Sequence, residues 1–143
     1  ILSCKSPIEK YAPMFKKFFK TNDSDKEIKN VPALSCKPLQ SEAQLEDIKA
    51  QSNVRLQIIY KHSSSCGISS MVLRQLEKSL IEFNGRADFY FLDLLSFRSV
   101  SNEVASRFQV LHQSPQLILL KNDTVVAHDS HYDLLQLPIE KYL

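Results

Sequence analysis

The segment Val54–Phe83, VRLQIIYKHSSSCGISSMVLRQLEKSLIEF, changes its hydrophobic period halfway along and so indicates the fold. Its first part, Val54–Tyr60, is rich in apolar and β-branched residues and predicts a buried strand. From Cys66 onward apolar residues recur every three or four positions, which predicts an amphipathic helix that ends at Asn84-Gly85. The inward side chains of that helix would be Ile68, Met71, Val72, Leu76, Leu80 and Phe83. Cys66 therefore lies where a strand passes into a helix.

The sequence before this unit predicts one more strand and helix. Residues 33–40 (ALSCKPLQ) contain a short strand candidate. Ser41 and Gln44 have the spacing of a capping box, which predicts a helix over about 42–51.

The sequence after this unit alternates in the same way. Residues 87–95 (ADFYFLDLL) predict a second buried strand, and the next helix would take Ser99 or Ser101 as its N-cap. Residues 116–121 and 124–128 predict two strands joined by a two-residue turn at Asn122-Asp123. A short helix interrupted at Pro138 would end the chain. The order β-α-β-α-β-α-β-β-α predicts an α/β fold with a central mixed sheet of four or five strands.

Length and composition suit one domain of ordinary globular character. The chain has 143 residues, 43% of them hydrophobic, and a net charge of +2. This charge balance gives no indication of a nucleic-acid partner, and no apolar run reaches the roughly 20 residues that span a bilayer. Residues 1–32 are polar, charged and interrupted by prolines, so we expect a weakly ordered arm, with Met14 a possible natural start, followed by a domain over 33–143.

The three cysteines, Cys4, Cys36 and Cys66, favour free thiols over a disulfide framework. Their number is odd, and no pair has zinc-ligand spacing. The simplest inference is a reducing, cytoplasmic compartment. Cys36 falls in a strand candidate and is expected to be buried, although a role as a resolving thiol stays open.

Cys66 is the candidate catalytic residue. A cysteine at a helix N-terminus faces unpaired amide groups and the positive end of the helix dipole, and both favour the thiolate. Lys61 and His62 could add positive potential. Cys66-Gly67-Ile68-Ser69 is a C-x-x-S site, in which Ser69 can support the thiolate but cannot form a disulfide, so an outside thiol must finish a turnover. The alternative is a small, inert core cysteine.

A second candidate element is Ser114-Pro115, between a helix and a strand. X-Pro bonds are the peptide bonds commonly found in the cis form. A cis proline opposite the helix-start cysteine would leave the preceding backbone free to pair with an extended thiol substrate. His112, just before it, could support the thiolate or meet a substrate carboxylate.

The chain resembles the monothiol bacilliredoxins of the bacillithiol system, a thioredoxin-like family, over about Cys36 to the C-terminus. The resemblance is carried by SSSCGIS, by HQSPQLILLKND some forty-five residues later, and by VVAHDSHYDL. The chain has Gly67 where the family often has proline, Asn122-Asp123 where the family usually has Asn-Gly, and Tyr132 where tryptophan is common.

This resemblance implies a thioredoxin-like fold and removal of bacillithiol from S-bacillithiolated proteins. Cys66 would attack and then carry the bacillithiol, which acts as a co-substrate, and no metal or bound cofactor is implied. Pro115 would be a cis proline shaping the substrate groove, and His112 and Ser114 would line it. Ser65, Gly67 and Ser69 complete the predicted site residues.

Two other functions stay open from the sequence. The domain could be a non-catalytic thioredoxin-like module that binds partner proteins in the same groove. It could also be a glutaredoxin-like enzyme that uses another low-molecular-weight thiol. His62, His128 and His131 have structural explanations at least as good as functional ones, and we expect Asp93 to cap a turn.

Overall fold

A computed structural model of the protein describes residues 33–143. The predicted arm over 1–32 and its possible start at Met14 lie outside the described residues. The strands are β1 (Cys36–Pro38), β2 (Leu56–His62), β3 (Ala87–Asp93), β4 (Gln116–Lys121) and β5 (Thr124–Ser130). The α-helices are α1 (Ala43–Gln51), α2 (Gly67–Leu80) and α3 (Arg98–Phe108), and the 3₁₀ helices are η3 (Ile81–Phe83), η4 (His131–Gln136) and η5 (Ile139–Tyr142).

The strands form one mixed sheet in the order β1-β3-β2-β4-β5. β1 and β2 run parallel to β3, whereas β4 runs antiparallel to both β2 and β5. The predicted α/β class with a mixed sheet is thus confirmed. Lys61, near the end of β2, pairs with Gln116 at the start of β4. The segments that leave β2 and enter β4 therefore meet at the same end of the sheet.

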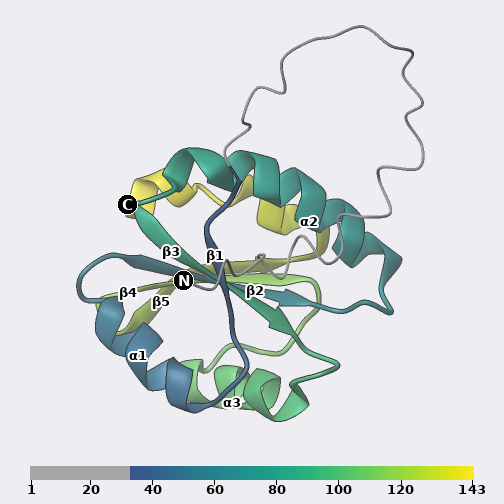
Figure 1. Cartoon of the computed structure of the whole chain (residues 1–143), viewed down its shortest axis with the longest axis horizontal. Coiled ribbons are helices and arrows are strands. Elements are labelled where there is room, and N and C mark those ends of the chain that lie inside the picture. Colours follow the sequence, from purple (N-terminus) through teal and green to yellow (C-terminus); the bar gives the residue numbers. More distant parts are fainter. Residues whose placement is uncertain (1–32) are drawn as a thin grey trace, which may run out of the picture.

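Helices cover both faces of this sheet (Figure 1). α2 lies with η4 and η5 on one face, and α1 and α3 lie on the other. Side chains of β2 contribute alternately to the two cores, because successive residues of a strand point to opposite faces: Tyr60 packs on the α2 side and Ile59 on the α1 and α3 side. The same alternation directs Lys61 toward α3.

The central strand begins and ends later than the sequence predicted. All seven residues of β2, Leu56–His62, are buried, whereas Val54 is 72% exposed. Residues 51–55 instead form hydrogen-bonded turns, in which the Asn53 amide N–H contacts the Ala50 carbonyl. The predicted range Val54–Tyr60 is therefore shifted by two residues.

α2 keeps its predicted place, but two of its expected inward residues are exposed. Val72, Leu76 and Leu80 are buried, as the helical period predicted. Ile68 and Met71, in the first turns of α2, are instead 37% and 44% exposed. The prediction was wrong for these two side chains.

The predicted helix caps are only partly present. The Gln44 side chain accepts hydrogen bonds from the Ser41 backbone N–H and hydroxyl, which is one half of a capping box, but the N-cap position of α1 is Glu42. α3 begins after Phe97, so Ser99 and Ser101 lie inside it and neither is the N-cap. Ser101 is buried against the sheet instead.

The predicted turns are confirmed by their backbone conformations. Gly85 has φ +79°, a value that L side chains rarely adopt, and it ends the α2–η3 unit. Asn122 and Asp123 have φ of 52° and 65°, the left-handed pair that a two-residue hairpin requires. The C-terminal helix is two short 3₁₀ helices separated at Pro138.

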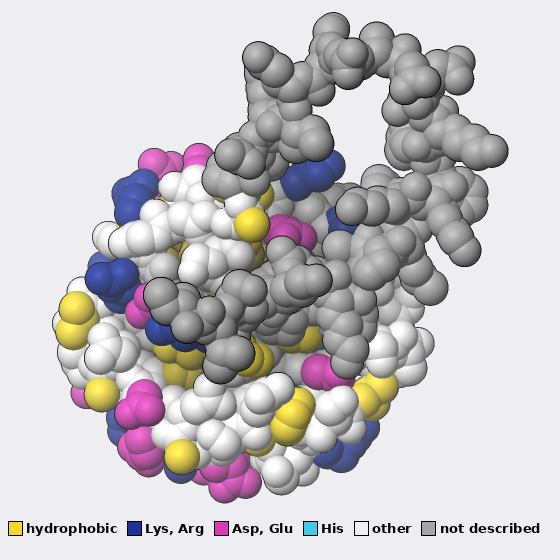
Figure 2. Space-filling model, in the orientation of Figure 1, with side chains coloured by type: hydrophobic (Ala, Val, Ile, Leu, Met, Phe, Trp, Pro, Cys, Tyr) yellow, Lys and Arg dark blue, Asp and Glu magenta, His cyan; other side chains and the backbone are white. Residues whose placement is uncertain are grey.

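The surface carries both signs of charge. On the face shown in Figure 2, basic and acidic side chains are interspersed around the rim, as the net charge of +2 suggests. Among the helices of residues 33–143, none has the length and apolar character to cross a bilayer.

Candidate active site

Cys66 lies at the N-cap position of α2, directly after the turn that follows β2. Its backbone is extended, with φ −100° and ψ 114°, and its N–H donates to the Ser63 carbonyl at 3.1 Å. Ser65 takes part in the same turn, because its hydroxyl lies 2.9 Å from that of Ser63. Residues 63–65 thus form the tight turn that places Cys66 at the N-terminus of α2.

The pKa of the Cys66 thiol is lowered, mainly by amide groups of the first helical turn. The backbone N–H of Ser69 is the largest cause, the Ile68 N–H adds to it, and partial burial opposes both. The Ser69 hydroxyl makes a smaller contribution in the same direction. Cys66 itself is half-buried. The helix-start position and the lowered pKa favour a reactive thiol over an inert core cysteine.

Ser69 connects the thiol to the protein core. Its side chain is fully buried, and within residues 33–143 no hydrogen-bond partner occupies its hydroxyl, which is directed to the thiol that it helps to stabilise. The Tyr60 hydroxyl donates to the Ser69 carbonyl at 2.9 Å. Burial, followed by the nearby Cys66 charge, raises the pKa of Tyr60, so the phenol stays protonated and holds the first turn of α2 in place.

The Ser114-Pro115 peptide bond is cis. It lies at the start of β4, at the same end of the sheet as Cys66, because Lys61 pairs with Gln116. The Pro115 carbonyl accepts a hydrogen bond from the His131 N–H at 2.9 Å. The late Ser-His pair therefore ties the end of β5 to this segment, which gives His131 a structural role. The Ser114 hydroxyl is buried and has no hydrogen-bond partner among the described residues.

His112 is exposed, and its ring contacts Lys61. The sequence had suggested that Lys61 adds positive potential at Cys66. The Lys61 Nζ lies 3.3 Å from His112 Nδ1 and donates to the Ser101 carbonyl at 3.0 Å. Lys61 is fully buried. Its ammonium is directed to α3 and His112, and the pKa shift of Cys66 arises from amide groups instead. A lysine inside an otherwise apolar buried strand was the signal that could have identified this contact.

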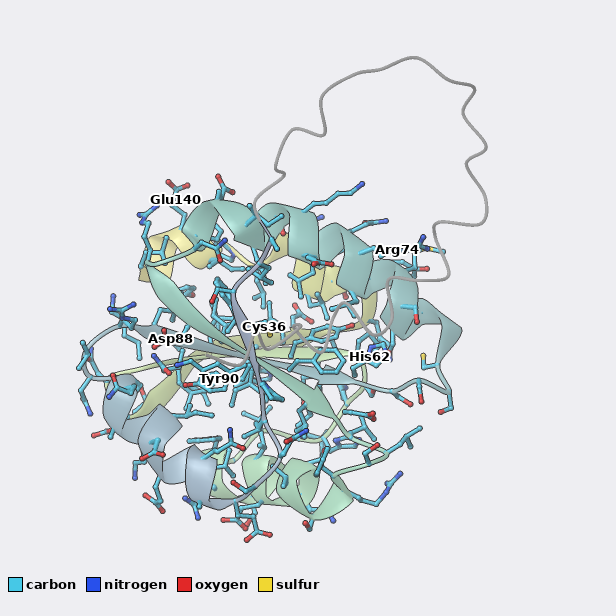
Figure 3. All side chains as sticks on the ribbon, viewed as in Figure 1. Cys36, His62, Arg74, Asp88, Tyr90 and Glu140 are labelled. Atoms are coloured by element: carbon cyan, nitrogen blue, oxygen red, sulfur yellow. The ribbon has the colours of Figure 1, made fainter. Side chains whose placement is uncertain are left out.

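His62 belongs to the core. It is fully buried, and its ring centroid lies 5.2 Å from that of Phe91 and 6.1 Å from that of Tyr60. Within residues 33–143, no three His, Cys, Asp or Glu side chains are grouped so as to hold a metal ion. In Figure 3, His62 lies toward the end of the sheet from which the chain enters α2.

Cys36 differs from Cys66 in the direction of its pKa shift. Burial, with a contribution from Glu77, raises its pKa to about 12. It packs against the core on the α2 side of the sheet, and Figure 3 places it over the middle of the sheet. Cys36 and Cys66 are both free thiols. Cys36 was expected to be buried, but it is only half-buried, whereas Cys4 lies outside the described residues.

Exposed apolar side chains surround the start of α2. Ile68 and Met71 belong to its first two turns, and the Tyr132 hydroxyl lies 3.6 Å from the Met71 sulfur. Tyr132 follows the late Ser-His pair and is 48% exposed. These three side chains were expected in the core or left without a role, and they instead give the site an apolar border.

Comparison with known proteins agrees with this geometry. The family model described as monothiol bacilliredoxin BrxC matches residues 37–137. A solved structure designated an oxidoreductase with a thioredoxin fold is 30% identical, with a TM-score of 0.61, and the match covers 69% of this chain and 85% of that one.

Two thioredoxins show the same fold at lower identity. Thioredoxin of Malassezia sympodialis is 20% identical, with a TM-score of 0.65. The match covers 78% of this chain and 94% of that thioredoxin. Oxidised thioredoxin O2 of Arabidopsis thaliana is 17% identical, with a TM-score of 0.61. The match covers 76% of this chain and 96% of that thioredoxin. The predicted thioredoxin-like fold is confirmed.

Proposed function

The chain belongs to the monothiol bacilliredoxin family, and on that premise we propose that it removes bacillithiol from S-bacillithiolated proteins at Cys66. It is a monothiol redox protein of thioredoxin-like fold. The observation that carries the proposal is the position of Cys66 at the N-cap of α2, where the Ser69 and Ile68 amides lower the pKa of its thiol.

The proposed reaction is a pair of thiol–disulfide exchanges. The Cys66 thiolate attacks the bacillithiol sulfur of the mixed disulfide, forms a disulfide with it and releases the protein thiolate, which takes a proton from water. A second low-molecular-weight thiolate then attacks the bacillithiol on Cys66, leaves as a disulfide with it and restores the Cys66 thiolate. Each step exchanges one S–S bond for another, so the number of disulfides does not change.

The need for an outside thiol follows from the residues near Cys66. Ser69 stands where a C-x-x-C site has its second thiol, and a hydroxyl cannot resolve a disulfide. Cys36, with a pKa of about 12, is almost entirely protonated at neutral pH and is a poor nucleophile there. Among the described residues no other thiol is suited to resolve the disulfide, so bacillithiol is proposed to remain on Cys66 until a free thiol arrives. No bound metal or cofactor enters this scheme.

The segment before β4 is the proposed substrate groove. His112, Ser114 and Pro115 lie there, at the end of the sheet that also holds Cys66. Ile68 and Met71, in the first turns of α2, offer apolar surface for a protein substrate. We also propose a cytoplasmic location, because the free thiols Cys36 and Cys66 fit a reducing compartment.

The test is transfer of bacillithiol from a labelled protein to this chain. Intact mass and peptide mapping should show one bacillithiol on Cys66, and free thiol should then release it. Cys66→Ser should abolish transfer with little change in stability, while the matched variant Cys36→Ser retains it. Transfer that survives in Cys66→Ser would contradict the proposal.

The choice of thiol is tested in the same assay. Faster turnover of bacillithiol mixed disulfides than of glutathione mixed disulfides supports a bacilliredoxin. The reverse order would indicate a glutaredoxin-like enzyme that uses another thiol. The absence of transfer from either substrate, with protein binding retained, would indicate the non-catalytic module.

A further inference from the structure

Lys61 is a buried cation with an unusual set of neighbours. Its side chain is fully buried in β2, and its Nζ donates to the Ser101 carbonyl of α3 at 3.0 Å. The same Nζ lies 3.3 Å from His112 Nδ1, in the segment that leads to Ser114-Pro115. Burying an ammonium group is costly unless its hydrogens find acceptors. The group opposite Nζ must therefore be an acceptor in both contacts.

The chemistry of the two groups determines where the proton of His112 resides. An ammonium has three donors and no acceptor, so a charged Lys61 requires His112 Nδ1 to accept. A neutral imidazole that accepts at Nδ1 carries its hydrogen on Nε2. The exposed part of His112 then offers an N–H donor and no acceptor.

We propose that Lys61 is a positioning residue, which fixes His112 in the Nε2–H tautomer and so presents one hydrogen-bond donor beside the cis peptide. This inference rests on the proposed function, because the donor would meet an oxygen of the thiol substrate. The cationic surroundings favour a carboxylate over a neutral carbonyl. The substrate class implied is thus a thiol that carries a carboxylate.

The charged groups around His112 act in the same direction. Lys61 approaches it from β2, and Arg98 acts on it from the start of α3. Burial, Lys61 and Arg98, in that order, lower the pKa of His112 below its ordinary 6.5, so the ring is neutral at neutral pH. Lys61, whose pKa burial lowers to about 8, keeps most of its charge there. A neutral donor surrounded by cations attracts an anion without a proton transfer.

Long-range ¹H–¹⁵N NMR of the full chain, labelled with ¹⁵N-histidine and free of substrate, tests the tautomer directly. The ring signals of His112 are assigned by their disappearance in His112→Gln. We expect them to show the Nε2–H pattern between pH 6.5 and 7.5. In Lys61→Met the tautomer preference should relax and the pKa of His112 should rise toward 6.5. Lys49→Met, which changes an exposed lysine, should alter neither.

A measurement on the unchanged protein keeps the test independent of how well Lys61→Met folds. The tautomer preference of His112 should weaken as pH rises through about 8, where Lys61 loses its proton. An Nδ1–H pattern at neutral pH would overturn the proposal, because a neutral Lys61 amine would then be the acceptor. So would a preference that does not change in Lys61→Met.

Kinetics of the transfer reaction test the substrate class. In Lys61→Met, we expect KM for a carboxylate-bearing thiol disulfide to rise roughly tenfold, the size expected for a hydrogen bond to a charged group, with kcat nearly unchanged. Methyl-esterification of the carboxylate should remove the difference between Lys61→Met and the unchanged protein. An equal KM rise for acid and ester would overturn the carboxylate assignment. If the tautomer result holds but no thiol is transferred, the proposed function fails and the positioning role stands.

Discussion

Lys61 brings a titratable amine into the space between the sheet and α3. Its ordinary pKa is 10.5, and burial lowers it to about 8 in the folded protein. Between these pH values the unfolded chain holds a proton that the folded chain has lost. The free energy of unfolding therefore increases with pH across this window, and it is independent of this group below about pH 8.

Stability should thus show a Lys61-dependent rise in mild alkali. A shift from 10.5 to about 8 corresponds to about 3 kcal/mol. We expect the unfolding free energy of the unchanged protein, minus that of Lys61→Met, to grow by up to that amount between pH 7.5 and 10.5. Urea unfolding at each pH measures it, and the subtraction removes groups common to both proteins, such as Tyr60 and Cys36. Parallel pH profiles would show that the lysine is not buried in solution.

At the scale of elements, the first position of α2 could hold a proline in place of Gly67. Gly67 is the first helical residue, and a Cβ added there would meet nothing within 4 Å. Cys66, before it, already has the extended backbone that a following proline requires. The amides that act on the thiol belong to Ile68 and Ser69, so the Gly67 N–H is dispensable.

Gly67→Pro should therefore stabilise the fold without disturbing the thiol. Proline is favoured at the first helical position and restricts the unfolded chain, which is worth roughly 0.4–1 kcal/mol. Thermal and urea unfolding measure the gain, and Cys66 alkylation checks the site. Gly85→Ala is the matched control, because φ +79° at Gly85 should make it destabilising. A loss of stability in Gly67→Pro, or a raised pKa of Cys66, would contradict this account of the helix start.

The types and order of the elements could be predicted from hydrophobic period and turn residues, but helix faces and caps could not. Period alone placed Ile68 and Met71 inside, because it does not reveal which turns of a helix are covered by the rest of the fold. The capping preferences of serine suggested Ser99 or Ser101, whereas Ser101 is needed against the buried sheet. Tertiary packing decided both.

The candidate site was predictable where it depends on local sequence. A lone cysteine at a strand–helix junction, with Ser69 one turn later, is sufficient to indicate amide stabilisation of a thiolate. The contact between Lys61 and His112 was missed because it joins residues 51 positions apart through the β2–β4 register. That register is a property of the folded sheet.

At the scale of the whole molecule, the described part of the chain, residues 33–143, forms two cores, one on each face of the sheet. Leu34, near its start, is 3% exposed in the core on the α2 side, and Asn84 holds the chain there through the Ala33 carbonyl and the Ser35 N–H. The family match begins shortly afterwards, at residue 37. We therefore propose that 33–143 folds without the preceding residues.

Deletion of residues 1–32 should leave the melting temperature nearly unchanged. The shortened chain keeps Leu34 and both contacts of Asn84, so it loses none of the core contacts described above. Thermal unfolding followed by circular dichroism makes the comparison. A second truncation that also removes Ala33, Leu34 and Ser35 should lower the melting temperature. A large loss in the first truncation would show that the preceding residues pack on the domain.

The central claim is that amides at the start of α2 stabilise the Cys66 thiolate. Its most direct test is the rate of iodoacetamide alkylation of Cys66 against pH, followed by peptide mapping so that Cys4 and Cys36 are scored separately. We predict a midpoint for folded Cys66 clearly below that of the same residue in urea, with Cys36 unreactive at neutral pH. A folded midpoint equal to or above the midpoint in urea would contradict the account.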